Sequence, residues 1–287
     1  MIEALFKYQF LQNAFYSAIL ASIVCGIIGV IIVEKKLVMM SGGIAHTSYG
    51  GVGLGYLLGF EPIIGAFLFS VAAAFGIGFI KRRGKANSDV IIGLFWSLGM
   101  ALGILFIALM KGYPPDISSY LFGNILSVTK SDLLLMIILS VVVVIVVVSL
   151  YNNWKAYLFD EEFAAIIGIR TAFLDYLLLL LIAMTVVILL RVVGIILVMA
   201  LLTAPAAAAG LLTNNFKNRI FIAIGLGVLF CISGLYISYE MDISSGAVIV
   251  VISVVFYIAV SIIKAIINHI NMAKIKNSKA ENGGCAE

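Results

Sequence analysis

The chain is poor in charge. Only 11% of its 287 residues are Asp, Glu, Lys or Arg, whereas 63% are hydrophobic; in soluble domains roughly a quarter of residues are charged. This shortage excludes a soluble globular domain. Runs of about 20 apolar residues, long enough to cross a bilayer core, recur along the chain. Because these runs lack the alternation of membrane strands, we predict an all-α integral membrane protein, a polytopic helical bundle.

Several chemical motifs are also missing. The sequence contains no GxxxxGK[ST] phosphate loop and no constellation for nucleophilic or acid–base catalysis, so we expect no ATP hydrolysis and no other enzymatic activity. Cys25, Cys231 and Cys285 form no CxxC pair, which favours simple packing for the first two. The basic residues lack interleaved aromatic residues, so we expect no nucleic-acid partner.

The apolar runs divide the chain into about eight or nine predicted membrane helices. Pro205 would interrupt the hydrogen-bond ladder of one of them, so the segment 172–212 is either two spans or one span and a broken helix. We expect one membrane domain over 1–267 and a polar tail over 268–287. The predicted spans lie near 10–33, 37–59, 62–80, 90–110, 132–150, 172–190, 192–212, 219–238 and 246–267.

Basic residues predict the orientation of these spans. With nine spans and an outside N-terminus, fourteen of the eighteen Lys and Arg residues fall on one side of the membrane. Because basic loops stay in the cytoplasm, we expect the 151–171 loop and the C-terminus there and the N-terminus outside. The net charge of +4 therefore reflects topology and contact with anionic lipid.

One apolar segment contains a histidine. Residues 41–51 read SGGIAHTSYGG, and His46 is one of only two histidines in the chain. An ionisable side chain within a span is costly and usually faces the bundle interior or a water-filled path. Two interpretations remain open: a neutral imidazole that donates to a backbone carbonyl for packing, or a transient ligand for a passing divalent metal ion.

Glycines follow the helical repeat in the same segment. Small residues four positions apart let membrane helices approach closely. Two such stripes occur, and the second one places His46 between two glycines. We assign helix packing to Gly42, Gly50, Gly51, Gly55, Gly59 and Pro205.

A polar loop follows the fifth predicted span. The stretch FDEEFAAIIGIR combines three acids, Asp160, Glu161 and Glu162, with apolar positions such as Phe163. It predicts a short amphipathic helix over about 158–170, capped by Asp160 and lying on the membrane surface or on a partner protein. A plain surface helix without a partner is the alternative.

Five sequence blocks together resemble permease subunits of the ABC-3 family, the zinc and manganese, sometimes iron, importers of bacteria and archaea. The resemblance extends from residue 41 to about residue 251. The blocks are SGGIAHTSYGGVGLGYLLG, SDVIIGLFWSLGMALGILFIAL, LFGNILSVTKSDL, FDEEFAAIIGIR with VVGIILVMALLTAPAAAAGLL, and GLYISYEMDISSGAVIVV.

The resemblance implies partners. Such a permease would sit in the cell membrane with a second permease subunit, most simply another copy of itself, two cytosolic ABC ATPase subunits and an extracytoplasmic metal-binding protein. It would hold no permanent cofactor and would carry Zn²⁺, or Mn²⁺ or Fe²⁺. The pattern Glu-x-Ala-x-x-x-Gly resembles the loop that docks into the ATPases. It implies coupling roles for Asp160, Glu161, Glu162, Phe163, Ala164 and Gly168.

The resemblance also implies metal ligands. His46 matches the family histidine, but Gly42 stands where the family usually has an aspartate, and Asn124 replaces a second expected aspartate. Asp89 matches an acidic residue at the start of a family helix, and an N-cap is its alternative role. A less anionic site favours zinc over manganese, because manganese prefers carboxylate and water ligands.

A carrier or channel that works alone is the competing function. Ion-coupled carriers usually show acidic or basic residues within their spans. Such residues are almost absent from the predicted spans of this chain, which favours a transporter driven by a separate ATPase.

Overall fold

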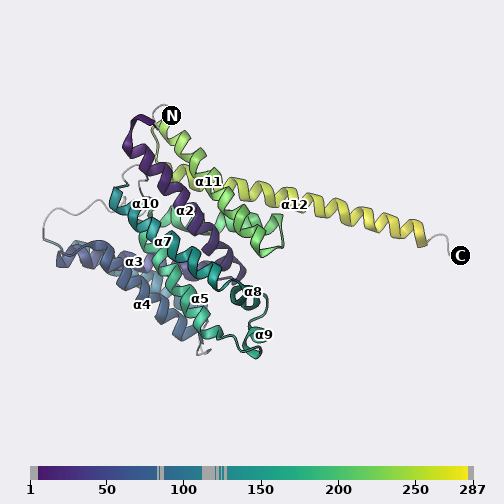
Figure 1. The fold of residues 1–287 in the computed structure, drawn as a ribbon, viewed down its shortest axis with the longest axis horizontal. Helices are drawn as coiled ribbons and strands as arrows, with labels where there is room; N and C mark the ends of the chain where they lie inside the picture. Colours follow the sequence, from purple (N-terminus) through teal and green to yellow (C-terminus); the bar gives the residue numbers. More distant parts are fainter. Residues whose placement is uncertain are drawn as a thin grey trace.

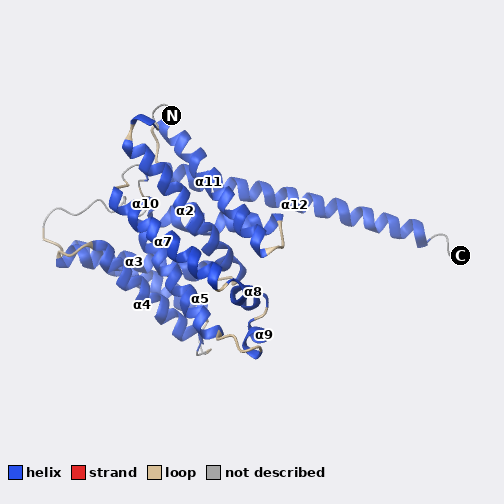
Figure 2. Cartoon of the chain, in the orientation of Figure 1, coloured by secondary structure: helices blue, strands red, loops and turns tan. Residues whose placement is uncertain are grey.

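The computed structural model describes residues 6–82, 84, 87–111, 120, 123, 125 and 128–283, of which Ser88 and 271–283 are described by their backbone alone. All the regular secondary structure in these residues is helical (Figures 1 and 2), so the all-α prediction is confirmed. The helices are α2 (Gln9–Glu34), α3 (Val38–Leu58), α4 (Pro62–Arg82), α5 (Ser88–Ala108), α7 (Lys130–Ser149), α8 (Tyr151–Phe159), α9 (Glu161–Ile166), α10 (Thr171–Leu212), α11 (Phe216–Met241) and α12 (Ser245–Gly283).

Every predicted span corresponds to one of these helices, and none extends more than two residues beyond its helix. Among the described residues, seven helices are long and apolar enough to cross a membrane. The helix α10 covers two of the predicted spans, 172–190 and 192–212. The helix α3 is not among the seven, because its glycines, hydroxyl residues and His46 lower its mean hydropathy.

The helix α10 is broken at Gly194, which has a φ of 75° and a ψ of 163°. Its first segment starts near Arg82, which pairs with Asp175, and ends near Glu61, which pairs with Arg191. The second segment runs back toward the side where α2 ends. The next helix, α11, begins there, because Arg219 near its start pairs with Glu34 at the end of α2. The break predicted at Pro205 is therefore wrong: the helix passes through this buried proline and turns at a glycine instead.

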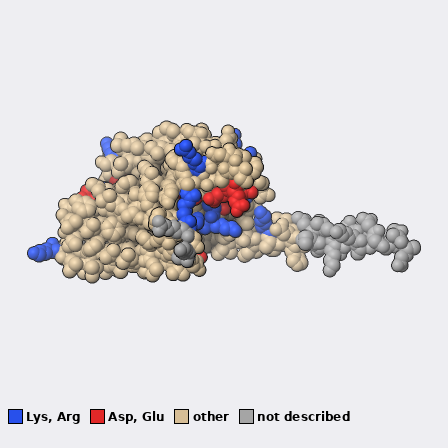
Figure 3. All heavy atoms as spheres, turned by 90° about the horizontal axis from the view of Figure 1, so that it is seen from below, with Lys and Arg blue, Asp and Glu red and all other residues tan. Residues whose placement is uncertain are grey.

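Ion pairs mark the two opposite ends of the bundle. One of them, the α9 end, contains α8, α9 and the last residues of α2 and α4. The other, the Arg191 end, contains Glu61 and the start of α7. Figure 3, a view from below Figure 1, shows acidic and basic side chains gathered in one region of a face that is otherwise mostly uncharged. Many of the other exposed side chains are large and apolar, as a lipid-facing surface requires.

The centre of the bundle consists of α10 and α2. In their apolar stretches 78% and 72% of the residues are buried, whereas only 17% are buried in the apolar stretch of α12. Figure 1 shows the yellow C-terminal part of α12 projecting away from the bundle. The helix continues without a break across residue 267, where the polar tail was expected to begin. Near this point Lys264 donates to the Leu211 carbonyl at the end of α10.

Candidate functional site

The helix α3 lies between α4 and α5 at very short range. A Cβ atom on Gly51 would overlap the Gly65 carbonyl oxygen of α4, and one on Gly55 would lie 2.6 Å from the Pro62 Cα. On the other side, a Cβ on Gly50 would lie 2.9 Å from the Gly99 carbonyl oxygen of α5. These positions accept only glycine without a backbone shift, so α3 is fixed by its neighbours.

Two of the stripe glycines have other surroundings. Gly59 ends α3 in the left-handed region with a φ of 74° and has no atom near its Cβ position, so its role is to cap the helix and not to pack. A Cβ on Gly42 would lie 3.0 Å from Met199 Cε and 3.3 Å from the Trp96 ring. Gly42 therefore faces side chains of α5 and α10.

His46 is half-buried one turn further along α3. Its ring stacks on Trp96 of α5, with ring centroids 4.0 Å apart and an angle of 10° between the planes. Its Nδ1 atom is buried and has no hydrogen-bond partner. The hydrogen bond to a backbone carbonyl that the packing role requires is therefore not made at this nitrogen, and the ring is positioned by stacking.

The described residues contain no group of three or more His, Cys, Asp and Glu side chains that could hold a metal ion. Asp89 is exposed in the first turn of α5, and its amide donates to the Asn87 side chain, so Asn87 and not Asp89 caps this helix. Trp96 lies seven residues further on, about 10 Å along the helix. Asp89 is therefore not an acidic partner of His46. Asn124, the other residue that the family resemblance singled out, lies outside the described residues.

The polar loop folds as two short helices. The predicted single helix over 158–170 is wrong in extent, because Asp160 adopts an extended conformation between α8 and α9. Its side chain accepts hydrogen bonds from the Glu162 and Phe163 amides and caps α9, as predicted. Gly168, with a φ of 86°, follows the end of α9 at Ile166.

The α9 segment buries little of its apolar surface. Ala164 is fully buried, but Phe163 is 53% exposed and Ile166 is 82% exposed. A cavity of about 610 Å³ lies beside it, between α8 and the turn that joins α10 to α11. Its lining combines apolar and basic side chains and includes Phe159, Phe163, Phe216, Lys155, Lys217 and Arg219.

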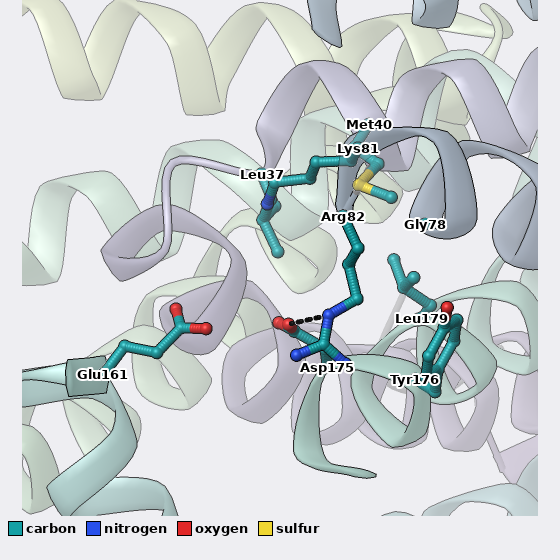
Figure 4. Close-up of a pocket in the computed structure, with 9 residues that line it drawn as sticks. All are labelled: Leu37, Met40, Gly78, Lys81, Arg82, Glu161, Asp175, Tyr176 and Leu179. Carbon is teal, nitrogen blue, oxygen red and sulfur yellow. Dashed lines mark ion pairs between the residues drawn. The ribbon is translucent and has the colours of Figure 1, made fainter. Parts of the chain in front are cut away.

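Ionic contacts join the α9 segment to the rest of the bundle. Lys35 donates to Glu161 at 2.7 Å and lies 3.6 Å from the centre of the Tyr157 ring. Tyr157 in turn donates to Asp175, and burial together with this hydrogen bond raises the pKa of Tyr157. Arg82 lies 4.0 Å from Asp175 across a small cavity (Figure 4). Sequence reasoning named Glu161 but missed the other residues of this group, because they are far apart in the chain.

Arg191 makes a second ionic group at the opposite end. Its guanidinium lies 3.0 Å from Glu61 of the α3–α4 turn and 2.9 Å from the buried Asp132 of α7. Asp132 also accepts a hydrogen bond from the Thr129 amide and donates its own amide to the Thr129 hydroxyl, which forms a capping box. None of these residues was predicted to form this group, although Arg191 is a conspicuous charge between two apolar runs.

Comparison with known proteins places these features in a family. The pattern of the ABC 3 transport family matches residues 7–264. The chain is 38% identical to "Manganese transport system membrane protein MntC" of Listeria monocytogenes, over 90% of this chain and 92% of that protein. It is 31% identical to "Probable iron transport system membrane protein" of Haemophilus influenzae, over 88% and 93%.

A solved structure agrees with the sequence comparison. The structure described as "PsaBC from Streptococcus pneumoniae in complex with Fab" matches with a TM-score of 0.82 and 34% identity, over 90% of this chain and 93% of that one. The family match over residues 7–264 includes the helices that carry His46 and the α9 segment. On these findings the chain belongs to the ABC 3 transport family.

Proposed function

We propose that this protein is the membrane-spanning permease subunit of an ATP-driven importer for divalent transition metal ions, with manganese as the principal cargo. The observation that carries the proposal is His46, whose buried Nδ1 has no partner although it lies in a helix of mostly buried residues. A neutral imidazole nitrogen is a common metal ligand, and an ionisable group within a span usually marks a transport path.

The permease works as a pair in this proposal. One chain offers the imidazole of His46 and, within the described residues, no cluster of three metal-binding side chains. A second copy facing the first would contribute a second imidazole and complete a weak site. A weak site suits transport, because the ion must bind readily and also leave readily.

Manganese is proposed because relatives covering about nine-tenths of this chain are named for manganese transport, among them proteins of Listeria monocytogenes and Streptococcus parasanguinis. Zinc is the second candidate. Gly42 removes a carboxylate from the position four residues before His46, and imidazole without carboxylate favours zinc. Competition between the two ions during uptake decides between these cargoes.

The α9 segment is proposed as the docking site of the ATPase subunits. Its exposed Phe163 and Ile166, its acids and the adjacent cavity offer a partner both apolar surface and charge. The basic residues around it, among them Lys155, Lys217 and Arg219, support a cytoplasmic location for the α9 end, because basic loops stay in the cytoplasm. The Arg191 end then faces the extracytoplasmic metal-binding protein, and the permease itself hydrolyses no ATP.

Reconstitution of the permease with its ATPase subunits in proteoliposomes tests the proposal. Manganese uptake should require ATP and should fall about tenfold or more in His46→Ala at unchanged ATPase content, because positioned ligands commonly contribute a factor of this size. His46→Gln should fall as well, since an amide is a poor substitute for imidazole. Uptake without the ATPase would support the carrier or channel instead, and a wild-type rate in His46→Ala would remove His46 from the path.

Tryptophan fluorescence tests metal binding without transport. The chain has two tryptophans, so a Trp154→Phe background leaves Trp96, which stacks on His46, as the only tryptophan reporter. Titration with Mn²⁺ and with Zn²⁺ should change its emission. The same titration of a variant that also carries His46→Ala should show no saturable change; a persisting signal would contradict the ligand role.

Docking is tested by co-purification. Phe163→Asp places a charge on the exposed apolar face of α9 and should reduce recovery of the ATPase subunits while leaving the fold of the permease intact. Phe75, on the lipid-facing surface of α4, is exposed to a similar extent. The matched control Phe75→Leu should leave recovery unchanged. Full recovery in Phe163→Asp would show that α9 is not the docking site.

A further inference from the structure

The turn between α2 and α3 is held from both sides. Glu34, the last residue of α2, pairs with Arg219 at the start of α11. The next residue, Lys35, pairs with Glu161 at the start of α9. The turn itself is tight, because the three amides that follow α2 donate to carbonyls of its last turn and Lys36 adopts a φ of 56°. The turn therefore forms a short, well-ordered connection from α2 to α3.

Lys35 contacts both short helices of the α9 end. Its amine donates to Glu161 of α9 and lies over the ring of Tyr157 of α8, at 3.6 Å from the ring centre. Its side chain is only 13% exposed, unlike that of its exposed neighbour Lys36. A cation held over an aromatic ring and beside a carboxylate has a defined position. Lys35 is therefore the point where the α9 segment meets the α2–α3 turn.

The helix that follows this turn carries His46. Eight residues separate Val38, where α3 begins, from His46, which corresponds to about 12 Å along a helix. Because glycines bring α3 into backbone contact with α4 and α5, the three helices form one packed unit, so α3 would move with them and would not bend locally. A displacement of Lys35 would thus be carried along α3 and would also displace His46.

A cavity beside the start of α3 gives it room to move. The cavity measures about 240 Å³ and is lined by Leu37 and Met40 at the start of α3 and by Glu161 of α9. Figure 4 shows Glu161 on one side of this cavity and the Arg82–Asp175 ion pair at a distance from Glu161. Packed interiors resist displacement, so an open volume at this point lets the packed unit that contains α3 shift at its α9 end when α9 moves.

We propose that Lys35 is a positioning residue that transmits movement of α9 to α3 and so to His46. This inference rests on the proposed function, in which α9 docks on the ATPase and His46 lines the metal path. Lys35 does not touch the metal ion and does not lie on the exposed face of α9. Its loss should therefore separate ATP hydrolysis from transport without releasing the ATPase.

The experiment compares uptake with hydrolysis in the same proteoliposomes. Lys35→Met removes the charge and keeps an unbranched side chain. We expect normal ATPase recovery, hydrolysis close to that of the wild type, and manganese uptake per ATP reduced at least about threefold, the size typical of coupling residues outside both sites. Lys35→Arg keeps a cation for Glu161 and the Tyr157 ring and should restore the ratio. Lys36→Met, a change at the exposed neighbour, should leave the ratio unchanged.

An unchanged ratio in Lys35→Met, or an equal loss in Lys36→Met, would overturn the inference. If the Lys35→Met complex does not assemble, Lys35→Gln, which also removes the charge but keeps a polar end, makes the same test, and an unchanged ratio there overturns the inference equally. Failure of the proposed function is distinguishable, because the wild-type complex would then show no ATP-dependent manganese uptake at all.

Discussion

The helices α3 and α9 carry the residues on which the proposed function depends, but the protein holds them in different ways. Fourteen of the 21 residues of α3 are buried, and its glycines allow backbone contact with two neighbours. Only Ala164 is buried among the six residues of α9, which depends on the Asp160 cap and the Lys35–Glu161 pair. The position of α3 is set by tertiary packing of many buried residues, whereas α9 is held by a few polar contacts and is open to a partner.

Gly51→Ala in α3 should have the largest effect on stability among the variants that test this difference. The added methyl group would overlap the Gly65 carbonyl oxygen, and backbone atoms cannot rotate away as a side chain can. Overpacking of this kind costs about 3 kcal/mol. Thermal unfolding of the detergent-solubilised permease should therefore shift to clearly lower temperature, with a loss of folded protein on expression.

Gly93→Ala is the matched control for this prediction. Gly93 also lies inside a helix, but no atom lies within 4 Å of its Cβ position. Alanine should be neutral there or stabilise the helix by about 0.5–1 kcal/mol, because glycine loses more backbone entropy on folding. If Gly51→Ala and Gly93→Ala melted alike, close packing would not be what holds α3.

Local features of both helices could be predicted from the sequence. The glycine spacing indicates a closely packed α3, and Asp160 before Glu161 and Glu162 indicates the cap of α9. The spans were predictable for the same reason, since a bilayer requires long apolar helices. Each of these signals is contained in one short stretch of the chain.

Features set by distant contacts could not be predicted in this way. Pro205 suggested a break, but a membrane helix can accommodate proline when neighbours satisfy the freed backbone groups. The break at Gly194 instead occurs where the backbone of Val193 meets Gly123 of another segment. Stacking of His46 on Trp96 depends on tertiary pairing, which periodicity alone does not reveal.

Glycine replacement at the two helix ends gives a smaller test. Gly59 after α3 and Gly168 after α9 have φ values of 74° and 86°, and no atom lies near either Cβ position. Alanine should cost about 1–2 kcal/mol of local backbone strain at both sites, because an L side chain disfavours this region. The measured shift in unfolding temperature should be similar for Gly59→Ala and Gly168→Ala.

The consequences for the partner should differ between these two variants. Gly168→Ala changes the direction in which the chain leaves α9 and should weaken recovery of the ATPase subunits, whereas Gly59→Ala, near the Arg191 end, should not. Equal losses of the ATPase in both variants would show that general instability, and not the shape of the α9 segment, controls docking.

The smallest expected effect belongs to the cap of α9. Asp160→Ala removes the acceptor of the Glu162 and Phe163 amides, a loss of about 1 kcal/mol. Because α9 has one buried residue, this change should fray the helix locally and leave the unfolding temperature of the bundle nearly unchanged. Hydrogen exchange should speed up at these two amides, while the amides of α3 keep their protection. Asp160→Asn keeps an acceptor and should retain slow exchange. A loss of protection in α3 as well would mean that α9 and α3 unfold as one cooperative unit and are not held independently of each other.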